Sequence, residues 1–226
     1  MSTADVNRFY CVDLDRTILN TRRASGVIIE LCRAYDEQLA ETIEREVVEY
    51  SYFGASYSVH DAIVRYASSE VADNIERQFI EAARTQSLKL PGADELISWL
   101  DELDDAQWGI LTYGSLNNQL MKVKALGLET RPVLVTQEPH KGTLIKGWYD
   151  KSSSGFGLPK EYSSVRAKEV ILIDDRAQSF EGLPESAARG YWVTQEAVDV
   201  MDAIPVPPGV VAVHDLTDVI RSEIDR

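Results

Sequence analysis

Two short apolar runs in this chain each end at a pair of aspartates. The runs, residues 9–12 and 170–173, have the length and the side chains typical of buried strands. The carboxylates that follow them are Asp13, Asp15, Asp174 and Asp175. Carboxylate oxygens are hard ligands that suit Mg²⁺. Acids at the ends of two separate buried strands therefore favour a shared cation over two unrelated solvated turns.

Strand and helix patterns alternate over much of the chain. Further strands are predicted at residues 108–112, 132–136, 191–194 and, as a last possible strand, 210–213. Helical periodicity occurs at residues 93–103 and 119–126, and a helix is predicted to begin at Lys141. This alternation favours an α/β fold with a mostly parallel sheet covered on both faces. Because ligands gather beyond the carboxyl ends of parallel strands, the aspartates and Thr112 are expected to share one crevice.

Residues from about 26 to 86 have a different character. They are rich in Glu, Ala, Arg and Tyr, and their apolar residues recur at helical spacing. No obvious strand pattern interrupts them. We therefore predict a block of helices between the first strand and the next α/β unit.

Asp13 and Asp15 are spaced for two complementary chemical roles. Side chains two residues apart on an extended backbone point the same way, here into the predicted crevice. One carboxylate can attack a phosphoryl group and form an aspartyl-phosphate, while a second protonates the leaving oxygen and later accepts a proton from water. We interpret Asp13 as the nucleophile and Asp15 as the acid/base. An Asx-turn or a helix N-cap is the structural alternative for this short pattern.

A turn that follows the strand at residues 108–112 is a candidate for phosphate binding. Thr112 offers a hydroxyl group, and Tyr113 and Gly114 offer backbone amides that the freedom of glycine leaves accessible. A turn that simply caps the next helix is the alternative. The aspartates on the other strands favour phosphate binding.

Lys141 is the candidate cation of the site. It lies just past the strand at residues 132–136, where an ammonium can neutralise charge among Asp13, a phosphoryl group and Asp174. Lys146 is a substitute, and an ordinary surface lysine is the default interpretation of either residue.

The overall charge narrows the choice of partner. The chain of 226 residues has 37 acidic and 23 basic residues and a net charge of -14. Such a field repels nucleic acid and anionic membranes, so neither is predicted as a partner. A phosphorylated small molecule is also an anion, so its site needs a local reversal of charge, which a bound metal supplies.

The location of the protein is predicted from its cysteines and its hydropathy. The two cysteines, Cys11 and Cys32, are interpreted as reduced core thiols rather than a disulfide framework. No uninterrupted apolar stretch approaches the ~18 residues of a membrane span. We predict a cytoplasmic protein.

In this order, the motifs resemble those of the haloacid dehalogenase (HAD) superfamily: a strand followed by DxDxT, then a Thr or Ser, a Lys and an acidic pair. Each motif has a candidate here: Asp13, Asp15 and Thr17 for the first, Thr112 for the second, Lys141 for the third, and Asp174 and Asp175 for the fourth. The resemblance implies a Rossmann-like three-layer core and Mg²⁺ as the cofactor. The metal ligands that it implies are Asp13, the Asp15 backbone carbonyl and Asp174, with Asp175 in support.

The resemblance also implies a helical cap. Residues 90–93 look like the return to the core in members that carry an insertion after the first motif. The implied division is a core domain of residues 1–20 and 87–226 and a cap domain of residues 21–86. The acid at Asp15 resembles phosphatases and phosphomutases, whereas dehalogenases lack it. The implied substrate is a small phosphorylated metabolite, since a cap shapes a pocket and excludes water.

The spacing departs from the family pattern in one place. Lys141 and Asp174 are 33 residues apart. This interval requires an inserted loop, which we place at residues 152–159, and it keeps Lys146 and Lys151 as alternatives for the active-site lysine.

Three other functions share parts of this pattern. A phosphomutase would use the same two acids but return the phosphoryl group to another hydroxyl. A receiver-type phospho-switch also combines an acidic pair, an Asp, a Thr and a Lys around Mg²⁺, in a different order along the chain. A non-catalytic binding module would bind Mg²⁺ without turnover. The apolar helix faces are compatible with packing on the core or on a second copy of the chain, so the oligomeric state is open.

Overall fold

The computed structural model describes residues 5–52, 57–195 and 205–226. The chain forms two compact units. The first unit consists of Met1–Ile18, Leu90–Thr112 and Arg131–Arg226, and the second consists of Leu19–Lys89 and Tyr113–Thr130. Residues 113–130 therefore belong to the same compact unit as the helical insertion. The division into a core of residues 1–20 and 87–226 and a cap of residues 21–86 stays a prediction about folding domains.

Among the residues that the structure describes, the first unit is built around a sheet of eight strands. They are β1 (Asp5–Val12), β2 (Ala106–Tyr113), β3 (Val133–Thr136), β4 (Tyr149–Asp150), β5 (Gly155–Gly157), β6 (Arg166–Asp174), β7 (Ala188–Val193) and β8 (Val210–Val213). The strands β2, β1, β6, β7 and β8 are neighbours in this order and run parallel, and β3 lies beyond β2. The predicted mostly parallel α/β sheet is confirmed.

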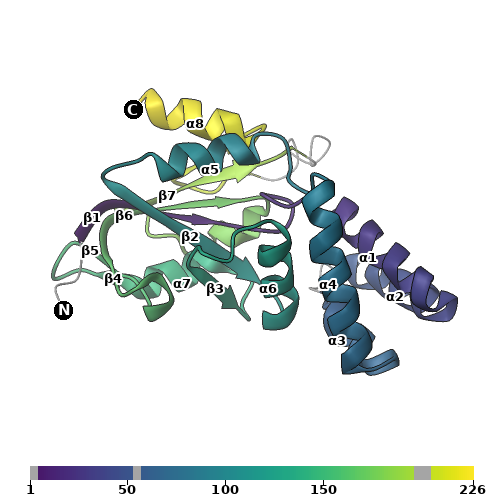
Figure 1. The fold of residues 1–226 in the computed structure, drawn as a ribbon. Coiled ribbons are helices and arrows are strands. Elements are labelled where there is room, and N and C mark those ends of the chain that lie inside the picture. Colours follow the sequence, from purple (N-terminus) through teal and green to yellow (C-terminus); the bar gives the residue numbers. More distant parts are fainter. Residues whose placement is uncertain (1–4, 53–56, 196–204) are drawn as a thin grey trace. The chain divides into compact units, whose positions relative to one another are not determined.

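Helices cover both faces of this sheet, which gives the unit three layers (Figure 1). On one face, α5 (Ala93–Asp101) packs beside α8 (Leu216–Ile224). On the other face lies α7 (Lys141–Trp148), with the short 3-10 helices η1 (Lys160–Tyr162) and η2 (Ala177–Phe180). The predicted start of a helix at Lys141 is confirmed.

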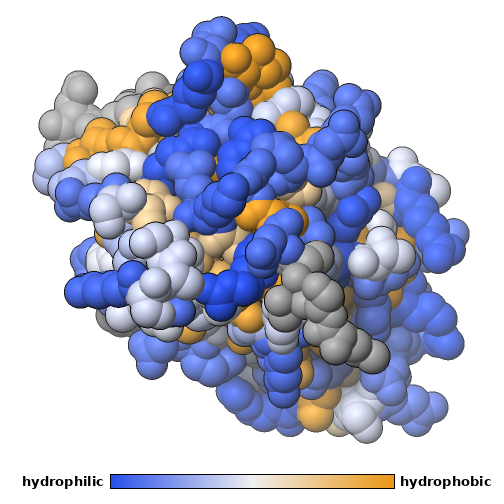
Figure 2. Space-filling view, turned by 90° about the vertical axis from the view of Figure 1, so that its left-hand side faces the viewer, coloured by the Kyte–Doolittle hydropathy of each residue, from blue (hydrophilic) through white to orange (hydrophobic). Residues whose placement is uncertain are grey.

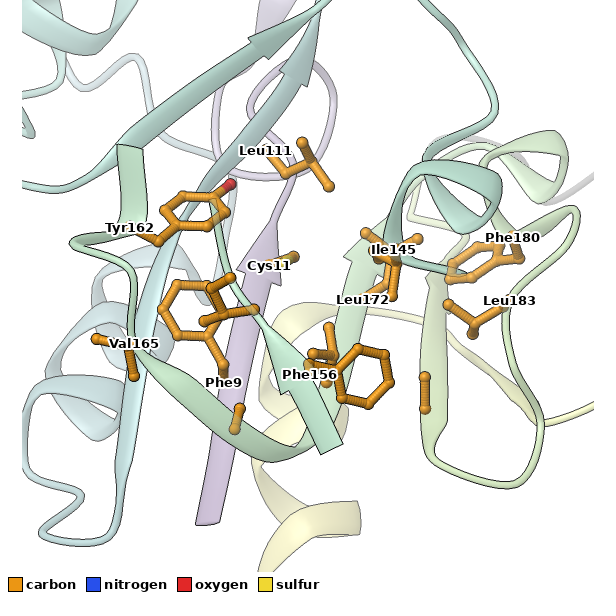
Figure 3. Packing of buried hydrophobic residues seen from close by; sticks show 14 of the residues in the cluster. Phe9, Cys11, Leu111, Ile145, Phe156, Tyr162, Val165, Leu172, Phe180 and Leu183 are labelled. Atoms are coloured by element: carbon orange, nitrogen blue, oxygen red, sulfur yellow. The ribbon is translucent and has the colours of Figure 1, made fainter. Parts of the chain in front are cut away.

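The core between the sheet and α7 is apolar and aromatic. Phe9 of β1 packs against Tyr162, with ring centroids 4.8 Å apart. Ile145 of α7 points toward Leu172 of β6 and toward Phe180, as Figure 3 shows. Close packing of this kind prevents the helix from shifting along the sheet. It fixes α7 against β1 and β6, the two strands that end at the acidic pairs.

The predicted loop at residues 152–159 is partly a hairpin strand, so the loop prediction is wrong for β5. This strand pairs antiparallel with β4 and with the start of β6. A Cβ atom at Gly155 would lie 3.0 Å from the Ala167 carbonyl oxygen, so the close approach of the strands favours glycine there. Because two of its three residues are glycine, the segment carries no strand signal in the sequence.

The second unit is helical. It contains α1 (Thr21–Tyr35), α2 (Glu37–Tyr52), α3 (Val59–Tyr66), α4 (Ser69–Thr85) and α6 (Leu116–Ala125). Side-chain oxygens of Asn20, Ser58 and Ser68 accept backbone hydrogen bonds and so begin α1, α3 and α4. The helices bury apolar residues such as Ile43 and Phe79. The predicted helical block is confirmed for the part of residues 26–86 that the structure describes.

The surface seen in Figure 2 agrees with the high share of charged residues in the chain, which is 27%. The face in Figure 2 is mainly hydrophilic, and its hydrophobic side chains form small separate groups. Within the described ranges, none of the helices combines the length and the hydrophobicity that crossing a membrane requires.

Cys11 and Cys32 are buried and free, so the prediction of core thiols is confirmed.

Candidate active site

The predicted aspartates lie at the carboxyl ends of β1 and β6. These strands are adjacent and parallel, and Val12 is level with Ile173. The backbone N–H of Asp13 donates to the Ile173 carbonyl oxygen at 2.9 Å, one residue beyond β1. Asp13 and Asp174 therefore leave neighbouring strands at the same height, as the parallel topology predicts.

Lys141 connects the two strand ends. Its Nζ donates hydrogen bonds to Oδ1 of Asp13 and to Oδ2 of Asp174, the second at 2.6 Å. All three side chains are almost fully buried. Lys146, in the last turn of α7, and Lys151 are both exposed. Of the three candidate lysines, the structure brings Lys141 to the aspartates.

Asp175 completes a group of three carboxylates. One oxygen atom each of Asp13, Asp174 and Asp175 lies within 4.8 Å of the others. The backbone carbonyl of Asp175 accepts a hydrogen bond from Nε1 of Trp192 at 2.8 Å, and its Oδ2 lies 3.4 Å from Nε of Arg16. Carboxylate oxygens are ligands of hard divalent cations, so these three residues fit a divalent cation.

Burial changes the proton affinities of this cluster. It raises the pKa of Asp13 to about 7, although the Lys141 ammonium opposes the rise. Burial also raises the pKa of Asp175, and the negative charges of Asp174 and Asp13 add to that rise. Burial lowers the pKa of Lys141, but the two carboxylates outweigh it and the net shift is upward. The cluster is therefore short of positive charge, which a bound cation would supply.

The predicted phosphate-binding residues lie at the end of β2. Ile110 is level with Val12, and Thr112, two residues further along, is buried at the carboxyl end of the strand. Tyr113 is the last residue of β2, and Gly114 follows with a φ of 144°, which side chains rarely permit. Both belong to the second compact unit. Their phosphate-binding role stays a prediction.

Asp15 lies in the turn that follows β1. Its side chain is half-buried and so more accessible than that of Asp13, as suits a group that exchanges protons with water. Thr17, the last residue of the first motif, is fully buried, and its hydroxyl group donates to Oδ2 of Asp13 at 3.5 Å. The turn thus orders the motif around Asp13.

Two residues near the cluster were missed by sequence reasoning. Trp192 holds the backbone of Asp175, and the need of a buried indole N–H for an acceptor is the signal that could have indicated such a contact. Arg16 has a φ of 61° and pairs with Asp175. No signal pointed to Arg16, because positive φ is normally associated with Gly, Asn or Asp.

The chain resembles known proteins in its structure but matches none of the compared families or curated proteins in its sequence. No family sequence model matches the chain, and no curated protein matches it in sequence. A haloacid dehalogenase-like hydrolase from Burkholderia xenovorans LB400 is 16% identical, with a TM-score of 0.65 and a match over 97% of this chain and 98% of that one.

Two further structures show the range of proteins that share the architecture. A HAD hydrolase from Bacillus subtilis, described as bound to magnesium, is 16% identical, with a TM-score of 0.56 and coverage of 96% of this chain and 99% of that chain. The L-2-haloacid dehalogenase from Xanthobacter autotrophicus, with chloropropionic acid covalently bound, is 15% identical, with a TM-score of 0.53 and coverage of 97% and 98%. The likeness extends over nearly the whole chain.

Proposed function

We propose that this chain, which has the fold of the haloacid dehalogenase superfamily, is a Mg²⁺-dependent phosphatase that hydrolyses a small phosphorylated metabolite. The observation that carries the proposal is the position of Lys141 between Asp13 and Asp174, with Asp175 close enough to share a cation. These groups supply a nucleophile, a fixed positive charge and cation ligands at one place on the sheet.

Asp13 is the nucleophile in this proposal. One of its carboxylate oxygens forms a bond to phosphorus as the bond from phosphorus to the leaving oxygen breaks, and Asp15 gives its proton to that oxygen. Asp15 then takes a proton from the water that attacks the phosphorus of the aspartyl-phosphate. Inorganic phosphate leaves, and the Asp13 carboxylate is restored.

Lys141 keeps the nucleophile oriented. Its hydrogen bonds to Asp13 and Asp174 fix the two carboxylates relative to each other, and its charge stabilises the negative charge that accumulates on the phosphoryl oxygens. The hydroxyl group of Thr112 is the proposed donor to one of these oxygens.

Mg²⁺ is the proposed cofactor. Asp13, Asp174 and the backbone carbonyl of Asp15 would hold it, with Asp175 in support. When bound, the cation acts as a Lewis acid on the phosphoryl oxygens. The excess of buried carboxylates over buried ammonium groups supports this choice.

Asp15 favours phosphoester hydrolysis over dehalogenation. A halide ion leaves without a proton, whereas the oxygen of a phosphoester needs one, so an acid beside the nucleophile has a function only in the second reaction. The helical insertion after the first motif resembles that of superfamily members with small substrates. Both features support a small phosphorylated metabolite.

The experiment measures phosphate release from p-nitrophenyl phosphate and from a panel of phosphorylated metabolites, with Mg²⁺ and with EDTA. We expect Mg²⁺-dependent turnover that falls by about 10³-fold or more in Asp13→Asn and that also falls in Asp15→Asn. Asp104→Asn, an isosteric change at an exposed turn, is the matched control and is expected to keep full activity.

The outcomes separate the candidate functions. Turnover that survives Asp13→Asn, or that EDTA leaves unchanged, would contradict the proposed mechanism. An isomerised sugar phosphate without free phosphate would indicate a mutase. Chloride release from 2-chloropropionate without phosphatase activity would indicate a dehalogenase.

A further inference from the structure

Arg16 stands at the edge of the carboxylate cluster in an unusual backbone conformation. Its φ is 61°, in the left-handed region where a side chain is unfavourable and glycine is not. A glycine would form the same turn at lower conformational cost. We therefore look for the role of Arg16 in the contacts that its side chain makes.

The side chain of Arg16 reaches a nearly buried carboxylate. Its Nε lies 3.4 Å from Oδ2 of Asp175, and the two side chains are 51% and 8% exposed. The backbone of Asp175 is fixed separately by the hydrogen bond from Trp192. The ion pair therefore acts on the orientation of the Asp175 carboxylate rather than on the path of the chain.

The Asp175 carboxylate needs such a contact because it lies close to two like charges. Oxygen atoms of Asp13 and Asp174 lie within 4.8 Å of it. Lys141 donates its two hydrogen bonds described above to those two residues. Arg16 and Lys141 both attract the Asp175 carboxylate, and the attraction of Arg16, whose Nε lies 3.4 Å away, is the larger of the two.

We propose that Arg16 is a positioning residue that orients the Asp175 carboxylate toward the cation site and thereby strengthens Mg²⁺ binding. The inference rests on the proposed function, because it assigns a role to the same site. Contacts that orient metal ligands contribute about 10- to 100-fold to metal affinity, and the low end applies here because Arg16 is half exposed.

Removal of Arg16 changes Mg²⁺ affinity in opposite directions depending on whether the side chain acts by orienting Asp175 or only through its charge. A positive charge near a cation site repels Mg²⁺, so removal of Arg16 would tighten binding if repulsion were its main effect. Removal weakens binding if orientation of Asp175 dominates. The two accounts therefore predict opposite changes in the dissociation constant for Mg²⁺.

The test measures the Mg²⁺ dissociation constant by isothermal titration calorimetry at mildly alkaline pH. Arg16→Gly removes the side chain and suits the left-handed backbone, so the relief of backbone strain offsets the lost ion pair and the thermal stability without metal is expected to stay close to that of the wild type. Its Mg²⁺ affinity is expected to fall about 10-fold. Arg16→Lys, which keeps the charge, is expected to recover part of the affinity.

Arg221→Gln is the matched charge control. This arginine is 72% exposed on α8 and pairs with Asp218 on the same helix, so its loss is expected to leave Mg²⁺ affinity unchanged. Unchanged or tighter binding in Arg16→Gly, with Asp13→Asn still abolishing binding, would overturn the inference and leave the proposed function standing. A wild-type protein that binds no Mg²⁺ would overturn both.

Discussion

Two clusters of charged and polar side chains in the first unit are largely buried, and they differ in how much positive charge faces their carboxylates. The cluster at the ends of β1 and β6 places three carboxylates around a single buried ammonium, that of Lys141. The cluster between α8 and the sheet surrounds one buried carboxylate, that of Glu223, with hydrogen-bond donors. The difference separates a site that can take up a cation from a contact that stabilises the fold.

The direction of the pKa shifts expresses this difference. Glu223 accepts hydrogen bonds from the hydroxyl groups of Tyr10 and Tyr191 and from the guanidinium of Arg189. Burial raises the pKa of Glu223, but these donors outweigh it and the net shift is downward. At Asp13 burial dominates and the pKa rises to about 7. The hydrogen-bond donors around each carboxylate therefore decide whether its pKa is raised or lowered.

The largest expected effect on stability comes from Lys141→Met. Without the ammonium, Asp13 and Asp174 become an uncompensated buried charge, so the free energy of unfolding of the metal-free protein falls by about 3–5 kcal/mol at mildly alkaline pH. Mg²⁺ is expected to restore part of this loss because it replaces positive charge in the folded state. Chemical denaturation with and without Mg²⁺ measures both effects. A loss that Mg²⁺ leaves unchanged would break the comparison.

Glu223→Gln tests the second cluster. The change removes the charge that faces Arg189, and the free energy of unfolding is expected to fall by about 1–3 kcal/mol at neutral pH. Because the folded-state pKa of Glu223 is depressed, the wild-type advantage exists above the ordinary pKa of a glutamate and is lost as pH falls through the folded-state value. Urea denaturation at neutral and acidic pH measures this. Mg²⁺ is expected to stabilise the wild type and the variant equally, because both keep the first cluster. A difference in stability that Mg²⁺ closes would contradict a purely structural second cluster.

The pH dependence of Mg²⁺ binding sharpens the contrast further. With a pKa of about 7, Asp13 must lose a proton before it can act as a ligand, so the affinity falls as pH drops through that value. Between about pH 8 and 6 the dissociation constant is expected to rise about tenfold. Calorimetric titrations at both pH values measure the change. An affinity that does not vary over this range would show that Asp13 is not protonated near neutrality.

Thr17→Val is expected to have the smallest effect. The hydrogen bond from the Thr17 hydroxyl group to Asp13 is long, at 3.5 Å, and valine has nearly the same shape. The free energy of unfolding should fall by no more than about 1 kcal/mol. Thermal denaturation measures the change. A loss as large as that of Lys141→Met would assign the stabilisation of Asp13 to the hydroxyl group and not to the ammonium.

The first cluster could be predicted from the sequence, whereas the second could not. Asp13 and Asp174 each follow a short apolar run, so local pattern and parallel topology together place them side by side. Tyr10 and Glu223 are 213 residues apart, and nothing in the pattern of the first strand indicates which helix will cover it. Local periodicity specifies elements better than it specifies the partners of polar side chains.

Within the first cluster, the identity of the lysine and the contact of Arg16 could be decided only from the tertiary structure. Lys141 and Lys146 lie on the same helix, and only the orientation of α7 on the sheet brings Lys141 to the aspartates. The left-handed backbone of Arg16 had no sequence signal, because that conformation is associated with glycine. The short strand β5 was missed for the related reason that its glycines lack β-propensity.

The most direct test of the first cluster as a catalytic site is the location of the phosphoryl group during turnover. Enzyme mixed with a substrate and Mg²⁺ would be quenched in acid during a single turnover, digested and analysed by mass spectrometry. We predict a phosphoryl group on the peptide that contains Asp13, absent from Asp13→Asn and from samples without Mg²⁺. Phosphate release without any phosphoryl group on Asp13, or with the group on another residue, would contradict the assignment of the nucleophile.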